Sequence, residues 1–232
     1  MIMGNLSLID ILEKHQSTFK PVVPFDADKQ RLLPLDLSAK NPALHQIDEF
    51  NLGMFVQQQL DAAHAVFGIG GYLEDRRLYR HSSLFGSDTV NEAPEPRTIH
   101  LGVDIWGVGG SHVHAPLAGN VHSFAFNNQE GDYGATIILQ HQLEGIVFYT
   151  LYGHLSLADI AHLENGRPVV AGQHFAHFGS PAENGNWPPH LHFQIISDMQ
   201  GKTGDYPGVC AVSQVPFYRE NCPDGNLILQ LR

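Results

Sequence analysis

Between about residue 97 and residue 197 the chain consists of short apolar segments separated by turn signals, and this pattern strongly restricts its fold. Each segment has the length of a β-strand, and most end at or near glycine, asparagine or proline. A helical period is almost absent, which predicts a mainly β fold with an antiparallel sheet or a half-open barrel. The predicted strands are residues 99–106, 112–117, 120–127, 135–142, 146–153, 173–178 and 190–196.

The N-terminal part has a different pattern, which predicts two helices joined by irregular chain. Ser7 can cap a short helix over SLIDILEKH, in which apolar residues form one stripe. A second helix is expected to begin near Asp48 and to end before the glycines at 68, 70 and 71. The stretch between them is rich in proline and aspartate, and predicts chain that wraps a surface.

These patterns divide the chain into three expected parts. Residues 1–95 form an N-terminal accessory extension, residues 96–198 form the core, and residues 199–232 form a tail that packs on the core. The final residues, LILQLR, are expected to add an edge strand.

Two motifs in the extension have simple structural interpretations. GIGGY at residues 68–72 is interpreted as a flexible turn rather than a dinucleotide site, because no strand is predicted before it and no second half of that motif follows. The run EDRRLYRHSS contains Arg76, Arg77 and Arg80, and predicts a solvated face. The alternative is a clamp for a substrate carboxylate, since arginine binds carboxylates in a bidentate manner.

The charge of the chain excludes some classes of partner. The net charge is −11 over 232 residues, with a hydrophobic fraction of 43% and a charged fraction of 16%. This composition is typical of a globular protein, and the negative charge disfavours nucleic acids, anionic membranes and anionic wall polymers as partners.

The N-terminal residues predict a cytoplasmic location. MIMGNLSLIDILEKHQ has no basic segment, and Asp10, Glu13 and Lys14 interrupt its apolar residues, so it resembles neither a signal peptide nor a membrane span. A periplasmic or extracellular location is the alternative if a leader has been removed. Cys210 and Cys222 form one disulfide or none, and reduced thiols are expected in the cytosol.

Five polar residues have the spacing of a catalytic metal site. His100 and Asp104 are four residues apart in one predicted strand, and His190 and His192 are two apart in another. Residues at i, i+2 and i+4 share one face of a strand, so these side chains can meet in one cleft. His154 follows the apolar run IVFYTLYG. Three ligands, an open position for water and nearby bases are what catalytic zinc requires.

Chance is the competing explanation for this set. The chain contains fifteen histidines, and a single histidine is more often a structural or solvated residue than a ligand. His112 and His114 repeat the same two-residue spacing in SHVHAPLAG. The acidic residue at matching strand spacing distinguishes the set that contains Asp104.

The motifs HLGVDIW, HAPLAGNV, YGHLS, GQHFAHFG and PPHLHFQI occur in this order over residues 97 to about 197. Together they resemble the lysostaphin and LytM-type zinc metallopeptidases, which have a β-lytic metallopeptidase-like fold known as the duplicated hybrid motif. The resemblance implies zinc ligands at His100, Asp104 and His192, and a catalytic pair at His154 and His190. It also implies hydrolysis of a peptide bond, usually in bacterial cell-wall peptides.

The substrate is the least transferable part of this resemblance. The loop SPAENGNWPP replaces the family's usual loop rich in serine, threonine and glycine, and His112, His114 and His177 replace other residue types. The tail segments YPGVC and NCPDGNLIL resemble a metallopeptidase-like module that occurs alone or beside kinase-like and aminotransferase-like domains, which implies a small amide or modified peptide.

Two other functions use similar residues. One is a zinc-binding module of the same fold without hydrolytic activity, which hydrolysis of short peptides would distinguish. The other is a non-haem iron oxygenase, which also uses two histidines and one carboxylate, although its first motif usually has His-x-Asp or His-x-Glu spacing. The oligomeric state has no signal in the sequence.

Overall fold

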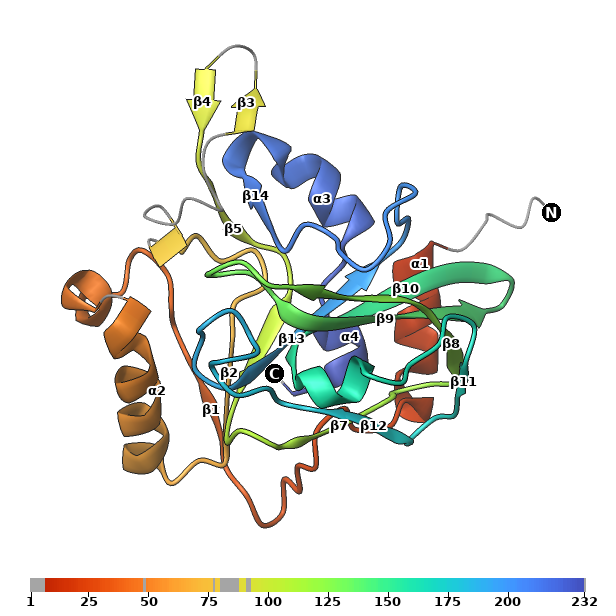
Figure 1. Ribbon diagram of the computed structural model, residues 1–232, viewed down its shortest axis with the longest axis horizontal. Helices are drawn as coiled ribbons and strands as arrows, with labels where there is room; N and C mark the ends of the chain where they lie inside the picture. Colours follow the sequence, from red (N-terminus) through yellow and green to blue (C-terminus); the bar gives the residue numbers. More distant parts are fainter. Residues whose placement is uncertain (1–6, 48, 77, 80–87, 91–92, 232) are drawn as a thin grey trace.

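The structure is a computed structural model that describes residues 7–47, 49–76, 78–79, 88–90 and 93–231. Its centre is a sheet of eight strands (Figure 1), antiparallel except where the first two strands run parallel. In sheet order the strands are β1 (Leu32–Pro34), β2 (Phe67–Gly70), β6 (Val103–Trp106), β13 (His190–Ile196), β10 (Ile146–Leu155), β9 (Gly134–Leu143), β8 (Gly119–Asn127) and β11 (Pro168–Val169).

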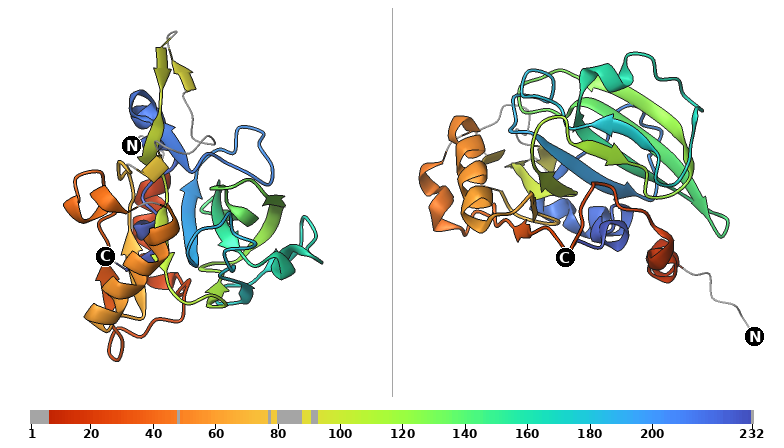
Figure 2. Two further views of the ribbon diagram at one scale, coloured as in Figure 1. Left: turned by 60° about the vertical axis from the view of Figure 1, so that its left-hand side comes forward. Right: turned by 90° about the horizontal axis from the view of Figure 1, so that it is seen from below.

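Smaller sheets and short helices surround this sheet. The two-stranded sheets are β5 (Arg97–His100) with β14 (Val209–Ala211), β7 (His112–His114) with β12 (His174–His177), and β3 (Asp88–Val90) with β4 (Ala93–Glu95). The helices are α1 (Leu8–His15), α2 (Glu49–Ala63), α3 (Val215–Asn221) and α4 (Asn226–Leu229). Single 3-10 turns cover Gln16–Thr18, Pro42–Gln46, Leu157–Ile160 and Val212–Gln214. Helix α1 contacts α4, although the two helices lie near opposite ends of the chain (Figure 2).

The central strands are buried on both faces. Along β13, Leu191, Phe193 and Ile195 enter the main hydrophobic core, as their alternation with polar residues predicts. Ile138 of β9 points to the opposite face, into a second cluster that includes Tyr206 and other residues of the C-terminal tail. The mainly β fold is thereby confirmed, with tail side chains covering one face of the sheet.

Both predicted N-terminal helices are present. Ser7 accepts a hydrogen bond from the Asp10 amide and caps α1, as predicted, and Asp48 itself lies outside the described residues. No helix among the described residues is long and apolar enough to cross a membrane. Cys210 and Cys222 are both buried free thiols.

The turn predicted at GIGGY is wrong for residues 68–70, which belong to the fully buried strand β2, and the chain turns only after it, at Gly71 and Tyr72. β2 pairs with both β1 and β6 and so extends the central sheet. A Cβ on Gly70 would lie 2.7 Å from the Leu35 carbonyl oxygen, and a Cβ on Gly68 would collide with the Leu35 side chain. These glycines therefore permit close packing within a strand, which sequence reasoning mistook for flexibility.

The predicted strand 99–106 is two strands in different sheets. β5 pairs with β14, whereas β6 pairs with β13. The strand conformation is interrupted between them at Leu101 and Gly102. A Cβ on Gly102 would lie 2.5 Å from the imidazole Nε2 of His192. The break thus leaves room for that ring. The strand predicted at residues 190–196 has the predicted ends, and the other predicted strands are present with shifted ends.

The edge strand predicted at LILQLR is also wrong, because residues 226–229 form α4. Ile228 and Leu229 are buried in the main core, and Leu227 packs against it. Consecutive apolar residues would point to opposite faces of an edge strand, one of them exposed to solvent, whereas one helical turn places all three against the core. Gln230 then ends the helix in the left-handed region, with φ of 51°.

Candidate metal centre and active site

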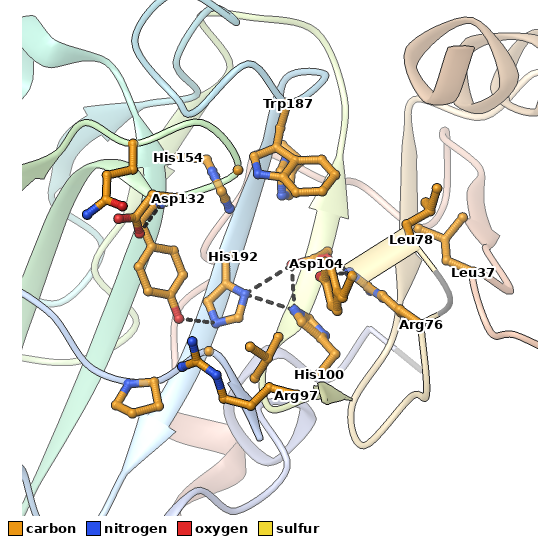
Figure 3. A pocket seen from close by; sticks show the side chains of 18 of the residues that line it. Leu37, Arg76, Leu78, Arg97, His100, Asp104, Asp132, His154, Trp187 and His192 are labelled. Atoms are coloured by element: carbon orange, nitrogen blue, oxygen red, sulfur yellow. Dashed lines mark hydrogen bonds and ion pairs between the residues drawn. The ribbon is translucent and has the colours of Figure 1, made fainter. Parts of the chain in front are cut away.

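A cavity of about 280 Å³ lies where β5, β6 and β13 approach one another (Figure 3). All of the residues predicted for the site line it, namely His100, Asp104, His154, His190 and His192. Each of these side chains belongs to a residue that is at most 5% exposed. The structure therefore brings the predicted set together in one place.

Three of these residues point one donor atom each toward a common centre. Nε2 of His100 lies 2.9 Å from Nδ1 of His192 and 3.2 Å from Oδ1 of Asp104. Nδ1 of His192 lies 3.3 Å from the same carboxylate oxygen. This triangle matches the ligand separations of about 3.3 Å that tetrahedral coordination at 2.0–2.1 Å would require.

Neighbouring groups determine which nitrogen of each imidazole carries a proton. Nδ1 of His100 lies 2.8 Å from the Gly71 carbonyl oxygen and must donate to it. Nε2 of His192 lies 2.9 Å from Oε1 of Gln194. The Gln194 amide is oriented by donating from Nε2 to the carbonyl oxygen of Pro207 and to Sγ of Cys222. His192 therefore donates from Nε2, and its Nδ1 is left unprotonated.

The centre of the triangle consequently holds three lone pairs and no proton. Among the described groups, none donates a hydrogen bond to Oδ1 of Asp104. Two neutral nitrogens and a carboxylate oxygen at 2.9–3.3 Å repel one another unless a cation lies between them. The donor set fits a divalent metal ion that accepts nitrogen and oxygen ligands.

Arg76 holds the other oxygen of the carboxylate. Its Nη1 donates to Oδ2 of Asp104 at 2.5 Å and to the Tyr79 hydroxyl at 2.8 Å, and its Nε donates to Glu74 at 2.8 Å. Burial opposes ionisation of Asp104, but His100 and Arg76 outweigh it and hold the pKa of that carboxyl well below its usual range. Asp104 is therefore an anionic group whose Oδ1 accepts no hydrogen bond from the described groups.

The predicted solvated face at EDRRLYRHSS is wrong for Arg76, which is 3% exposed. It pairs with Asp104 and Glu74, while its Nη2 has no hydrogen-bond partner among the described groups. Arg77 and Arg80 lie outside the described residues. The physical reason is that a buried carboxylate needs a buried cation, a requirement that the local sequence does not reveal.

His154 and His190 lie side by side at the edge of the triangle. Their ring centroids are 4.1 Å apart. Nδ1 of His154 donates to the Asn184 carbonyl oxygen at 2.9 Å, and Nδ1 of His190 donates to that of Pro188 at 2.8 Å. Trp106 stacks on the His190 ring with centroids 4.0 Å apart. Each histidine thus has a fixed ring and an Nε2 lone pair available as a base.

Burial keeps both of these histidines neutral. It lowers the pKa of His190 to about 4, and together with the neighbouring His190 it lowers the pKa of His154 well below its usual range. His154 also has a positive φ of 61°, at an irregularity in the pairing of β10 with β9. A strained conformation for a residue with a side chain is often found at functional sites.

Sequence reasoning missed the residues that orient the predicted set. Gln194 had a signal, because it continues the two-residue spacing of His190 and His192. Tyr133, whose hydroxyl lies 3.3 Å from Nε2 of His192, had none. The carbonyl of Gly71 also had none, since every residue has one.

Residues 98–204 match the model of peptidase family M23. This match to a peptidase family agrees with the resemblance seen in the sequence. A comparison with curated proteins found no match.

Several solved structures are weakly similar to this chain. The catalytic domain of the antimicrobial peptidase lysostaphin from Staphylococcus simulans is 23% identical, covers 70% of this chain and 96% of its own, and has a TM-score of 0.39. A zinc-containing peptidase from Vibrio cholerae is 24% identical over 52% of this chain and 34% of its own, with a TM-score of 0.34. A chain of a SpoIIIAH and SpoIIQ complex is 18% identical over 57% and 86%, with a TM-score of 0.39. Because these likenesses are weak, the family assignment rests on the match to the family model.

Proposed function

We propose that this protein is a zinc-dependent hydrolase of a peptide or amide bond, with His100, Asp104 and His192 as the metal ligands. The observation that carries the proposal is the set of three unprotonated donor atoms within 3.3 Å of one another. Their hydrogen-bonded neighbours hold these atoms in place, as is usual for metal ligands.

Zinc bound at these residues would supply a Lewis acid and a water nucleophile of lowered pKa. His154 and His190 are proposed as the catalytic pair because each presents an Nε2 lone pair beside the ligands. One of them would take a proton from the attacking water at Nε2. The imidazolium so formed would stabilise the developing oxyanion and return that proton to the leaving amine, while the other histidine would accept a hydrogen bond from the water and orient it. The Trp106 ring and the Pro188 carbonyl keep His190 in position for this transfer.

The cavity walls favour a peptide or small amide as substrate. Leu37, Leu52, Leu78 and Trp187 form an apolar side, while Asp132, Arg97 and Asp205 add polar groups. A cavity of about 280 Å³ lies just below the usual range for ligand pockets, and fits one or two residues of a chain. A peptidoglycan-like peptide is the class that the family suggests, and a small amide is the alternative.

In the proposed division of the chain into an extension, a core and a tail, the N-terminal extension contributes residues to the wall of the cavity. Leu37 and Leu52 of residues 1–95 are each 1% exposed and line the cavity together with Trp106 of the core. We propose that the extension buttresses the substrate side of the cavity. Tail residues 205–209 complete the opposite wall.

Substitution of a ligand tests the proposal. His100→Ala is expected to bind one zinc equivalent fewer than the wild type in elemental analysis after dialysis, and to lose hydrolysis of short peptides, because two ligands hold zinc poorly. His162→Ala, which removes an exposed histidine elsewhere, is the matched control. Equal zinc content in His100→Ala and wild type, with the variant folded by circular dichroism, would contradict the assignment.

A further inference from the structure

Three further histidines meet on the small sheet of β7 and β12, away from the cavity described above. They are His112 on β7, and His174 and His177 on β12. One ring nitrogen of each lies within 4.8 Å of the others. His174 and His177 line a second cavity of about 180 Å³. Among the described residues, none lines both this cavity and the one described above. This cluster is therefore separate from the proposed catalytic centre.

An irregular strand brings the cluster together. His112 and His177 are directly paired across the two strands. His174 and His177 are three residues apart, so a regular strand would point them to opposite faces. The register shifts between His174 and Ala176, which introduces one extra residue and returns His174 to the face of His177.

Hydrogen bonds orient two of the rings for coordination. Nδ1 of His177 lies 2.9 Å from Oδ1 of Asp159, while the other oxygen of that carboxylate accepts from the His177 amide at 2.7 Å. Nε2 of His174 lies 3.1 Å from the Ala176 carbonyl oxygen and donates to it. These contacts leave Nε2 of His177 and Nδ1 of His174 as lone-pair donors. A histidine held by a carboxylate in this way is common behind metal ligands.

The ring packing leaves these donors without mutual hydrogen bonds. The His112 and His174 rings stack with centroids 4.1 Å apart, and His177 meets both edge-on, at 5.3 Å and 4.5 Å. His112 and His174 are exposed, so an ion can enter from solvent. The net charge of −11 favours accumulation of cations around the chain.

We propose that His112, His174 and His177 form a second metal site, which binds a divalent late transition-metal ion such as zinc, copper or nickel. Imidazole nitrogens suit these ions, whereas magnesium and calcium prefer oxygen ligands. Three protein ligands leave an open position for water or for a group from another molecule. The ion links β7 to β12 and stabilises this small sheet.

The test measures zinc binding by calorimetry in the full chain, with nickel as a second probe. The double variant His112→Ala, His174→Ala is expected to bind one equivalent of zinc fewer than the wild type. Its Tm should rise less on addition of zinc, because the ion no longer links β7 to β12. Both substituted residues are exposed, so the variant should fold. The matched control is His162→Ala, which should bind the same number of equivalents as the wild type.

Comparison with His100→Ala keeps the two sites distinct. His100→Ala should lose one equivalent of zinc and keep the nickel-binding event that the double variant loses. The double variant should keep the equivalent of zinc that depends on His100. The second site is overturned if the double variant binds as many equivalents as the wild type, or if His162→Ala loses the same equivalent. Either result leaves the catalytic zinc proposal untouched.

Discussion

At the scale of single residues, the proposed site depends on groups that fix protons rather than on the ligands alone. The Gly71 carbonyl and Gln194 determine which nitrogen of His100 and of His192 is unprotonated. Arg76 keeps one oxygen of Asp104 bound and the other free. Ligand types alone would allow several protonation patterns, and these contacts select the one that attracts a cation.

The two histidines proposed as the catalytic pair provide a separable prediction. His154→Ala and His190→Ala should retain the zinc that depends on His100, because neither supplies a proposed ligand. Hydrolysis of short peptides should fall by roughly 10²–10⁴-fold, the usual contribution of a positioned acid or base. Zinc content and kcat measured on the same preparations check this. A variant with wild-type kcat would remove that histidine from the proposed mechanism.

The burial of His141 should make the stability of the protein sensitive to acid, independently of the proposed metal site. Burial lowers its pKa to about 4, while an unfolded histidine titrates near ~6.5. The unfolded chain therefore binds a proton that the native chain excludes, and stability falls as pH decreases from about 6.5 to about 4. By pH 5 this single group should cost about 2 kcal/mol.

Comparison with His141→Gln isolates this effect. The free energy of unfolding in urea should decrease less between pH 7 and pH 5 in the variant than in the wild type. His162→Gln, at an exposed position, should retain the wild-type decrease. Identical decreases in all three proteins would show that His141 does not titrate as its burial implies.

At the scale of elements, irregularities place the functional side chains. The chain breaks between β5 and β6 beside the His192 ring, the pairing of β10 shifts near His154, and β12 shifts after His174. Regular periodicity found the strands, because alternation reports burial. It could not find these shifts, because a bulge depends on contacts between strands that are distant in sequence.

Gly102→Ala tests whether the interruption between β5 and β6 is needed to make room for the His192 ring. The added methyl group would lie 2.5 Å from His192 Nε2 and 2.8 Å from the Phe193 carbonyl oxygen, so the His192 ring must move. We expect weaker zinc binding in titrations, and a loss of stability of about 1–3 kcal/mol for the metal-free protein. Gly109→Ala is the matched control, since its Cβ meets only ordinary contacts at 3.5 Å. Zinc affinity equal to wild type in Gly102→Ala would show that the close approach is not needed.

At the scale of the whole molecule, segments from all parts of the chain complete one sheet and one cavity. β1 and β2 of the N-terminal part extend the central sheet beyond β6. Tyr206 of the tail belongs to the same hydrophobic cluster as Ile138, on the second face of that sheet. The cavity consequently has walls from residues near 37, 52, 104, 192 and 207, which have no proximity in sequence.

The sequence by itself predicted the mainly β core, the resemblance to a peptidase family and the residues gathered at the site. It could do so because strand alternation and ligand type are local properties, visible in segments such as HLGVD and HLHFQ. The tertiary structure alone decided that β2 is a strand, that Arg76 is buried against Asp104, and that His112 meets His174 and His177. The physical reason is that burial and convergence depend on which distant segments pack together, and the free energy of that packing outweighs the preferences of each short segment.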